Sequence, residues 1–251
     1  MTLLIKNGRL IDPKSNRDEI LDVLIEENKI AKIGTNLSEE NTEIIDARGL
    51  VIAPGLIDVH VHFREPGQTH KETIHSGAKS AAAGGFTTVV MMANTKPILS
   101  TPKVLIETLA IAKKEAIKIK AVASITQDFD GENLTDFAEL IKAGAIGFSD
   151  DGIPLTDAGV LRKALQKAKL TDSLLSIHEE DPNLIGTLGV NDGEVAHKCG
   201  FTGAPTVSEY SMMARDAMIA YETGARLHLQ HLSAGESVEV VRFAKNLGAK
   251  I

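Results

Sequence analysis

Two histidines separated by one residue, His60 and His62, lie in the stretch PGLIDVHVHFREPG at residues 54–67. Side chains along a β-strand repeat with a period of two, so both imidazoles point to the same face of the strand. A strand that only had to pack would carry Val, Ile or Leu at these positions. The spacing therefore predicts either two ligands for one metal ion or two histidines held by hydrogen bonds.

Three further groups that can bind a metal stand at the ends of later apolar runs, namely Asp151, His178 and His231. Neutral imidazole and carboxylate are ligands that zinc and similar first-row ions accept. Five such groups exceed the three protein ligands that one catalytic zinc usually takes, so we expect two metal ions that share a carboxylate. Asp150 is adjacent to Asp151 and would face the other way, so we expect it to cap the turn before Gly152.

Residues 53–251 alternate between apolar strand-like runs and amphipathic helical patterns. This alternation, with nearly continuous apolar strands, is typical of a parallel sheet covered by helices. The predicted strands cover residues 55–63, 87–94, 117–126, 145–152, 173–180 and 226–233. The predicted helices cover residues 72–83, 103–115, 133–143, 158–169, 208–223 and 237–246.

The placement of the polar residues favours a (β/α)₈ barrel of the TIM type. Strand after strand ends in a histidine, an asparagine or an aspartate, and the carboxyl ends of barrel strands converge on one mouth where active sites lie. A doubly wound sheet is disfavoured because no glycine-rich phosphate-binding turn follows the first strand. We count six strands, with residues 249–251 as the opening of a seventh, so we expect about six of the eight barrel strands in this chain.

Residues 1–52 read as a separate small domain. Short runs of alternating apolar and polar residues, separated by Gly, Asn, Asp and Pro, predict antiparallel strands.

The composition excludes several classes of protein. The formal net charge is −7 and only 4% of residues are aromatic, with no Trp, which argues against a nucleic-acid-binding surface. No run approaches the roughly 18 apolar residues of a membrane span, and the first residues lack a signal-peptide core. The lone Cys199 cannot form an internal disulfide. We therefore expect a cytoplasmic protein, with a homodimer as the commonest assembly.

Taken together, several motifs resemble the bacterial dihydroorotases of the amidohydrolase superfamily. These motifs are DVHVHFREPG, the Asn94–Pro97 segment, GFSDDG, HEED, and the pattern G.P, E, ARD and G.R.H.QHLS between Gly203 and Ser233. The resemblance implies a zinc-dependent, reversible cyclisation of N-carbamoyl-L-aspartate to L-dihydroorotate in pyrimidine biosynthesis, through a hydroxide held between two metal ions. It also implies that residues 1–52 form the N-terminal part of a β-sandwich.

The resemblance implies a role for each matching residue. His60 and His62 would hold one zinc ion, and His178 and His231 the other. Asp151 would bridge the two ions. The substrate, through its free carboxylate, would be bound by His62, Arg64 and Asn94. The catalytic general acid/base is unknown within this chain, because the family's aspartate is expected beyond Ile251. For Arg64, the alternative is a surface arginine paired with Glu65.

Two other functions stay open. The chain could belong to a non-catalytic homologue that acts as a scaffold, or to another cyclic amidohydrolase of the hydantoinase or allantoinase kind. Hydantoinase-like relatives bridge their metals with a carboxylated lysine on the fourth strand, and AGAIGFSDDG contains no lysine.

Two smaller expectations concern neighbours of the site. Residues 179–181 either orient His178 or lie in solvent, and His228, three residues before His231, should face away from the barrel lumen.

Overall fold

The chain folds into two compact units, residues 1–56 and 57–251. The computed structural model describes residues 2–185 and 189–251. The division falls after Leu56, whereas the sequence placed it after residue 52. Each unit is described by itself.

The first unit is a five-stranded sheet built around β1 (Thr2–Asp12). β2 (Arg17–Glu26) runs antiparallel to β1, and β3 (Lys29–Gly34) runs antiparallel to β2. β4 (Glu43–Asp46) and β5 (Val51–Ile52) run parallel to β1. The prediction of wholly antiparallel strands was therefore wrong for the last two. A loop after β3 carries the chain back, so that β4 and β5 run in the direction of β1.

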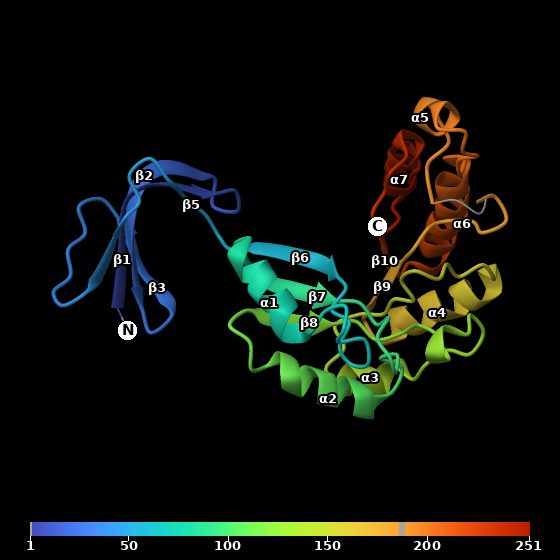
Figure 1. Ribbon diagram of the computed structural model, residues 1–251, viewed down its shortest axis with the longest axis horizontal. Helices are drawn as coiled ribbons and strands as arrows, with labels where there is room; N and C mark the ends of the chain where they lie inside the picture. The colour runs from blue at the N-terminus through green and yellow to red at the C-terminus, as the bar shows by residue number, and fades with distance from the viewer. Residues whose placement is uncertain (1, 186–188) are drawn as a thin grey trace. The chain divides into compact units, whose positions relative to one another are not determined.

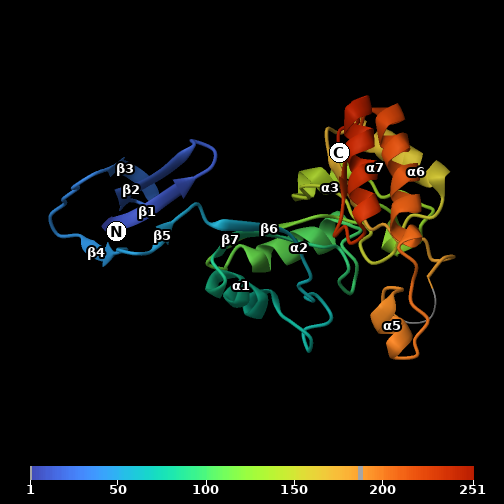
Figure 2. The ribbon, with the colours of Figure 1, turned by 90° about the horizontal axis from the view of Figure 1, so that it is seen from above.

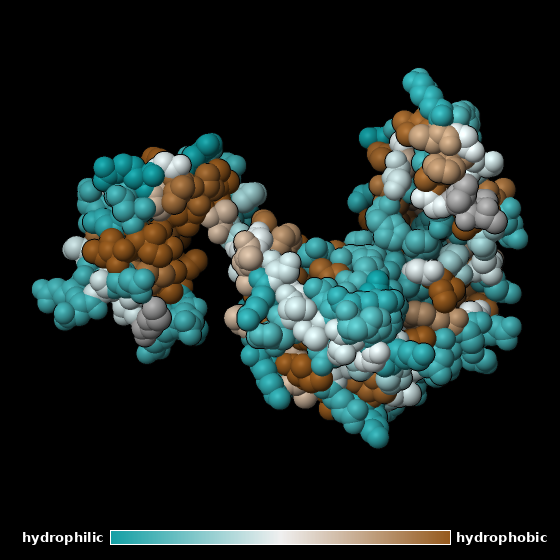
Figure 3. All heavy atoms as spheres, viewed as in Figure 1, coloured by the Kyte–Doolittle hydropathy of each residue, from teal (hydrophilic) through white to brown (hydrophobic). Residues whose placement is uncertain are grey.

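Much of the apolar surface of this sheet is uncovered. Its buried cluster consists of Leu4, Leu24 and Leu37, and apolar side chains gather on the face of β1–β5 seen in Figure 3. The exposed ones include Ile20, Ile30, Ile44, Ile45 and Val51. A sheet with an apolar face is stable when another layer packs on it. This exposure supports the sandwich interpretation, which stays a prediction.

Parallel strands and intervening helices form the second unit (Figure 1). β6 (Leu56–Val61), β7 (Phe86–Met91) and β8 (Lys118–Ala121) are neighbours in one sheet, and their arrows point the same way in Figure 1. β9 (Leu174–Ile177) and β10 (Arg226–Leu229) form a second parallel pair. Phe148 links the two groups through parallel bridges to Ala123 and Leu175.

The predicted strand at residues 145–152 is therefore only a short bridging segment. The backbone of Gly147 and Phe148 pairs with both neighbours, because Ala123 N donates to Gly147 O at 3.0 Å and Phe148 N donates to Leu174 O at 2.9 Å. The chain then turns at Gly152, whose φ is +89°. At the other edge, Lys250 forms a parallel bridge with Arg226, as expected for the opening of a seventh strand.

Seven α-helices and one short 3₁₀ turn (Gln127–Phe129) cover the described part of this unit. The helices are α1 (Ile74–Ala83), α2 (Pro102–Ala112), α3 (Phe137–Ala143), α4 (Ala158–Leu170), α5 (Glu194–Lys198), α6 (Val207–Thr223) and α7 (Gly235–Leu247). Six match the predicted helices, and α5 was not predicted. α6 and α7 lie side by side in both views (Figures 1 and 2). Among the residues that the structure describes, no helix is long and apolar enough to cross a membrane.

The core of the second unit lies between the strands and these helices. Phe137 of α3 stacks on Phe148 with ring centroids 3.8 Å apart, and both rings are fully buried together with Ile74, Leu105 and Leu161. The core thus fixes the bridging segment immediately before Asp150 and Asp151.

Gly147 allows the bridging segment to approach β9, and its replacement tests that approach. A Cβ at this position would lie 2.9 Å from Leu174 O, so Gly147→Ala should lower the free energy of unfolding by about 1–3 kcal/mol, as overpacking does. Gly235→Ala is the matched control, because an added Cβ there meets nothing within 4 Å and should be neutral or stabilise by up to about 1 kcal/mol. Urea unfolding measures both, and equal stability of the two variants would contradict the prediction.

Candidate metal centre

The carboxylate of Asp151 lies between two pairs of histidines. Its Oδ2 is 3.3 Å from Nε2 of both His60 and His62. Its Oδ1 is 3.4 Å from His231 Nε2 and 3.7 Å from His178 Nδ1. Each oxygen atom thus faces a different pair of imidazoles, and all five predicted ligands are brought together.

Within each pair, the nitrogen atoms converge on a common point. The Nε2 atoms of His60 and His62 are 3.1 Å apart, and His178 Nδ1 is 3.0 Å from His231 Nε2. Zinc binds imidazole nitrogen at about 2.0–2.1 Å in tetrahedral geometry, which places two nitrogen ligands roughly 3.4 Å apart. One ligand atom each from His60, Asp151 and His231 also lie within 4.8 Å of one another. The donor set and its spacing fit metal ions on both sides of Asp151.

Parallel strands explain why these residues meet. His60 lies in β6, His178 directly follows β9, and Asp151 follows the bridging segment. The carboxyl ends of parallel strands lie at one edge, so side chains there converge although they are far apart in the sequence.

His231 reaches the same place by a different backbone path, and this overturns the prediction for His228. β10 ends at Leu229, and His231 has a φ of +31°, so strand alternation does not extend to it. His228 instead pairs in register with Ser176 of β9, and the Gln230 side-chain amide donates to the hydroxyls of Ser176 and Ser149. His228 is therefore on the inner side of the barrel wall rather than outside it, and burial lowers the pKa of its imidazole.

The electrostatics of the site favour an ionised Asp151. Its burial raises the pKa of the carboxyl group, but the adjacent imidazoles of His178, His231 and His60 outweigh this and hold the pKa well below the usual range. Conversely, the neighbouring Asp151 carboxylate raises the pKa of His178, against the opposite effect of its own burial. An ionised, buried carboxylate surrounded by imidazoles therefore favours binding of a cation.

Glu180 holds His178 from the side away from Asp151. Its Oε2 lies 3.4 Å from His178 Nε2, while His178 Nδ1 faces Asp151. A carboxylate on the second ring nitrogen fixes the tautomer and orientation of a ligating histidine. Of the three acids after His178, Glu180 orients that histidine, whereas Asp181 accepts a hydrogen bond from Asn183 N at 2.9 Å.

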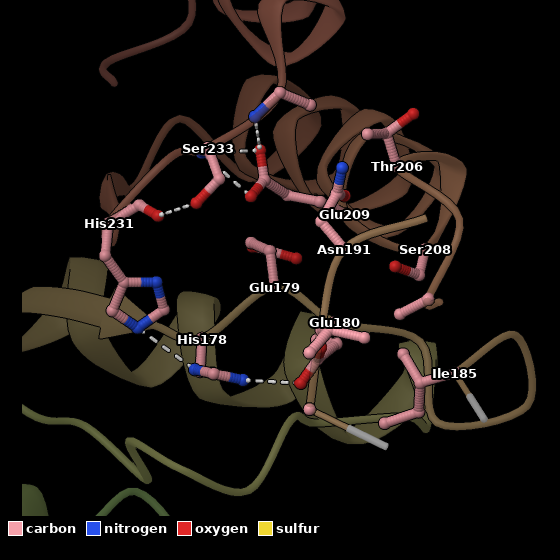
Figure 4. Close-up of a pocket in the computed structure, with 14 residues that line it drawn as sticks. His178, Glu179, Glu180, Ile185, Asn191, Thr206, Ser208, Glu209, His231 and Ser233 are labelled. Carbon is pink, nitrogen blue, oxygen red and sulfur yellow. Dashed lines mark hydrogen bonds and ion pairs between the residues drawn. The ribbon is translucent and has the colours of Figure 1, made fainter. Parts of the chain in front are cut away.

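Glu179 makes no hydrogen bond to His178 and lines a cavity of about 480 Å³, which His178 and His231 also line (Figure 4). The carboxylate is buried, and neither oxygen has a hydrogen-bond partner among the described residues. Burial and the nearby carboxylate of Asp216 raise its pKa well above the ordinary value. His178 and His231 form one wall of this cavity, as Figure 4 shows.

Asp150 has a different role from the predicted cap of the turn before Gly152. Its buried carboxylate accepts hydrogen bonds from Ile125 N at 2.6 Å and from Thr126 N and Oγ1. Burial raises its pKa to about 6 despite these bonds. It therefore ties the segment before Asp151 to the loop that follows β8, because its side chain points back toward that loop.

Of the predicted substrate-binding residues, Asn94 is beside the histidines, whereas Arg64 makes no hydrogen bond or ion pair with them among the described residues. Asn94 Oδ1 lies 3.1 Å from His62 Nδ1. The guanidinium of Arg64 has no ion pair or hydrogen bond within the described ranges, and Glu65 accepts from Ile74 N at 2.9 Å instead of pairing with it. The expected alternative, an Arg64–Glu65 pair, is therefore not present, and the substrate role of Arg64 stays a prediction.

The loops that carry Arg64 and Asn94 are joined by their backbones. Lys96 N donates to Pro66 O at 3.0 Å. Gly67 has a φ of +85°, and a Cβ there would lie 1.7 Å from Lys96 O. Only glycine permits this approach, which holds the two loops at one side of the site.

Some residues of the site were missed by the sequence reasoning. Gln230 is buried, and its amide nitrogen also lies 3.6 Å from Sδ of Met92, the residue that directly follows β7. Its side chain therefore connects the segments of Met92, Ser149 and Ser176 on the inner side of the barrel. Glu209 accepts from Ser233 N and Ala234 N just after His231. Both lie in the pattern quoted from Gly203 to Ser233, but spacing alone could not assign them a partner.

Parallel strands with helices between them, and imidazoles and a carboxylate at the carboxyl ends, define a TIM-type barrel of the amidohydrolase class, present here in part. The family model described as dihydro-orotase-like matches residues 49–237. The chain belongs to this dihydro-orotase-like family.

Curated relatives and solved structures agree with this assignment. The chain is 91% identical over 251 residues to the dihydroorotase of Lactococcus lactis subsp. lactis (strain IL1403), and the match covers 100% of this chain and 59% of the relative. It is 59% identical to the dihydroorotase of Streptococcus thermophilus (strain CNRZ 1066), over 99% of this chain and 59% of that protein. The chain thus spans about three fifths of the length of these relatives.

Two hydantoinase structures share the fold. The L-hydantoinase (dihydropyrimidinase) of Arthrobacter aurescens superposes with a TM-score of 0.82 at 23% identity, over 99% of this chain and 56% of that one. A D-hydantoinase superposes with a TM-score of 0.78 at 28% identity, over 100% of this chain and 56% of that one. The first likeness shows the fold alone.

Removing the carboxylate behind His178 should weaken metal binding. Glu180→Ala leaves His178 Nε2 without its partner, so the affinity for the zinc ion that His178 and His231 would bind should fall about 10- to 100-fold. Glu194→Ala, which removes an exposed glutamate paired with Lys198, is the control and should bind zinc as the parent does. Competition with a chromophoric chelator measures the affinity, and equal affinity of the two variants would show that Glu180 does not act on the metal ligand.

In the metal-free protein, Asp151 should contribute most to the free energy of unfolding at mildly acidic pH. The lowered pKa of Asp151 contributes stability above the ordinary carboxyl pKa, and this is lost as pH falls through the folded value. The raised pKa of His178 contributes stability below about pH 6.5, and this is lost as pH rises through the folded value. Asp151→Asn should therefore reduce the free energy of unfolding more at about pH 5.5 than at about pH 9. Urea titrations at both values test this, and a loss independent of pH would refute it.

Proposed function

We propose that this chain carries the dinuclear zinc site of a dihydroorotase, which interconverts N-carbamoyl-L-aspartate and L-dihydroorotate. The observation that supports this most is the position of Asp151, whose two oxygens face separate histidine pairs. A carboxylate in this position suits a bridge between two ions. Membership of the dihydro-orotase-like family, together with 91% identity to the dihydroorotase of L. lactis, indicates the ring that is opened and closed.

Each residue then has a task in the reaction. The histidine pairs and Asp151 hold the ions, and Glu180 and Asn94 keep two of the imidazoles in their orientation. Bound zinc would supply Lewis acidity toward the amide carbonyl and an activated water at neutral pH. Arg64 would bind the free carboxylate of the substrate, because guanidinium makes a bidentate, charge-assisted pair with carboxylate.

Two alternatives predict different outcomes. A non-catalytic scaffold has no need for five converging ligands and would bind no metal. A hydantoinase-like enzyme would share the fold seen in the structural neighbours but would use a carboxylated lysine, and the segment from Gly144 to Asp151 has none. Cytoplasmic location and a homodimer stay predictions.

The test measures metal and activity on the same samples. We expect two zinc ions per chain by elemental analysis. When the chain is joined to the part of the L. lactis relative that it does not match, we expect it to hydrolyse L-dihydroorotate and to leave hydantoin and allantoin unchanged. Arg64→Met should raise KM about 10- to 100-fold, since a hydrogen bond to a charged group contributes about 1.5–3 kcal/mol, and should change kcat less.

The matched control is Arg242→Met, which removes an exposed arginine paired with Glu239 and should leave KM unchanged. Absence of bound metal would support the scaffold and contradict the proposal. Turnover of hydantoin in preference to dihydroorotate would keep the metal site but assign another substrate.

A further inference from the structure

One helix, α6, is hydrogen-bonded to each of the three segments that follow Asp151, His178 and His231. These segments, residues 152–157, 179–181 and 232–234, are far apart in the sequence. Their common contact is the N-terminal two-thirds of α6. The residues of α6 that make these contacts are neither predicted metal ligands nor predicted substrate-binding residues.

The segment after Asp151 is held by Arg215. Its guanidinium donates to Leu155 O and Thr156 O, each at 2.6 Å, and its Nε donates to Asp216 at 2.5 Å. Asp216 is buried, so it anchors the guanidinium within the protein. A planar fork can bond two consecutive carbonyl groups and a carboxylate together, which a lysine ammonium cannot match.

The segment after His178 meets the start of α6. Asp181 N donates to Ser208 O at 2.9 Å. This bond fixes the chain three residues beyond His178, while Glu180 holds the imidazole itself.

The segment after His231 is held by Glu209. Its carboxylate accepts from Ser233 N at 2.9 Å and Ala234 N at 3.0 Å, and also from the Ser237 hydroxyl. Because His231 has a left-handed backbone outside the ladder of β10, the sheet does not fix its orientation. Glu209 supplies the constraint that the strand does not.

We propose that Glu209 and Arg215 are positioning residues for the two-metal site. Glu209 sets the orientation of His231, and Arg215 sets that of Asp151. The proposal rests on the proposed function in that it takes these groups as metal ligands. It predicts a difference between the two variants, because His231 belongs to one histidine pair whereas Asp151 faces both pairs.

The experiment measures zinc retained against chelators of graded strength, with elemental analysis of the 251-residue chain. Glu209→Gln should lower the affinity for one zinc ion about 10- to 100-fold and leave the affinity for the other unchanged. This is the effect expected when a residue that orients a metal ligand is lost. Arg215→Lys should lower the affinity for both zinc ions. Thermal unfolding of the metal-free variants shows that they are folded, and if one of them is not, the other decides the outcome.

Arg162→Lys is the matched control. Arg162 of α4 also forms a two-pronged bond to α6, to Glu222 at 2.7 and 3.1 Å, but near the helix end far in sequence from Glu209. It should retain both zinc ions as the parent does. Retention of both ions by Glu209→Gln and Arg215→Lys, or equal loss in all three variants, would overturn the proposal. A parent chain that binds no zinc would instead refute the proposed function.

Discussion

A buried carboxylate with an imidazole pair on each side organises the second unit. Removing a carboxylate from water is costly unless positive charge or hydrogen bonds compensate, and Asp151 obtains them from residues on three other strands. This requires parallel strands with a common carboxyl edge, and a bridging segment close enough to β9 to aim Asp151 inward. Gly147, Asp150 and Arg215 each serve that placement from a different side.

The local part of this arrangement could be predicted from the sequence. The period of two in a strand placed His60 and His62 together, and the positions of Asp151 and His178 at the ends of apolar runs predicted their convergence. Six helices followed from their amphipathic periodicity. These features depend on the chain within a few residues of each position.

Other features depend on tertiary contacts and could not be predicted. The argument from odd spacing failed at His228, because β10 ends before His231 and the backbone there is left-handed. Asp150 was assigned to the following turn, but its partners lie at Ile125 and Thr126. The parallel pairing of β4 with β1, and the contacts of Glu209, arise from how distant segments pack, which no local pattern records.

The fold and the site carry different information about function. Hydantoinases share this fold, and a fold by itself does not specify a substrate. The aspartate between the histidine pairs and the absence of a lysine in its segment separate this chain from a lysine-bridged site. Membership of the dihydro-orotase-like family then supports the substrate that we propose for the site.

Anomalous diffraction from zinc-loaded crystals tests the central claim most directly. Our account predicts two zinc peaks on opposite sides of the Asp151 carboxylate, one within about 2.0–2.1 Å of a nitrogen of each of His60 and His62 and one equally close to nitrogens of His178 and His231. A single peak, or zinc bound away from Asp151, would contradict it.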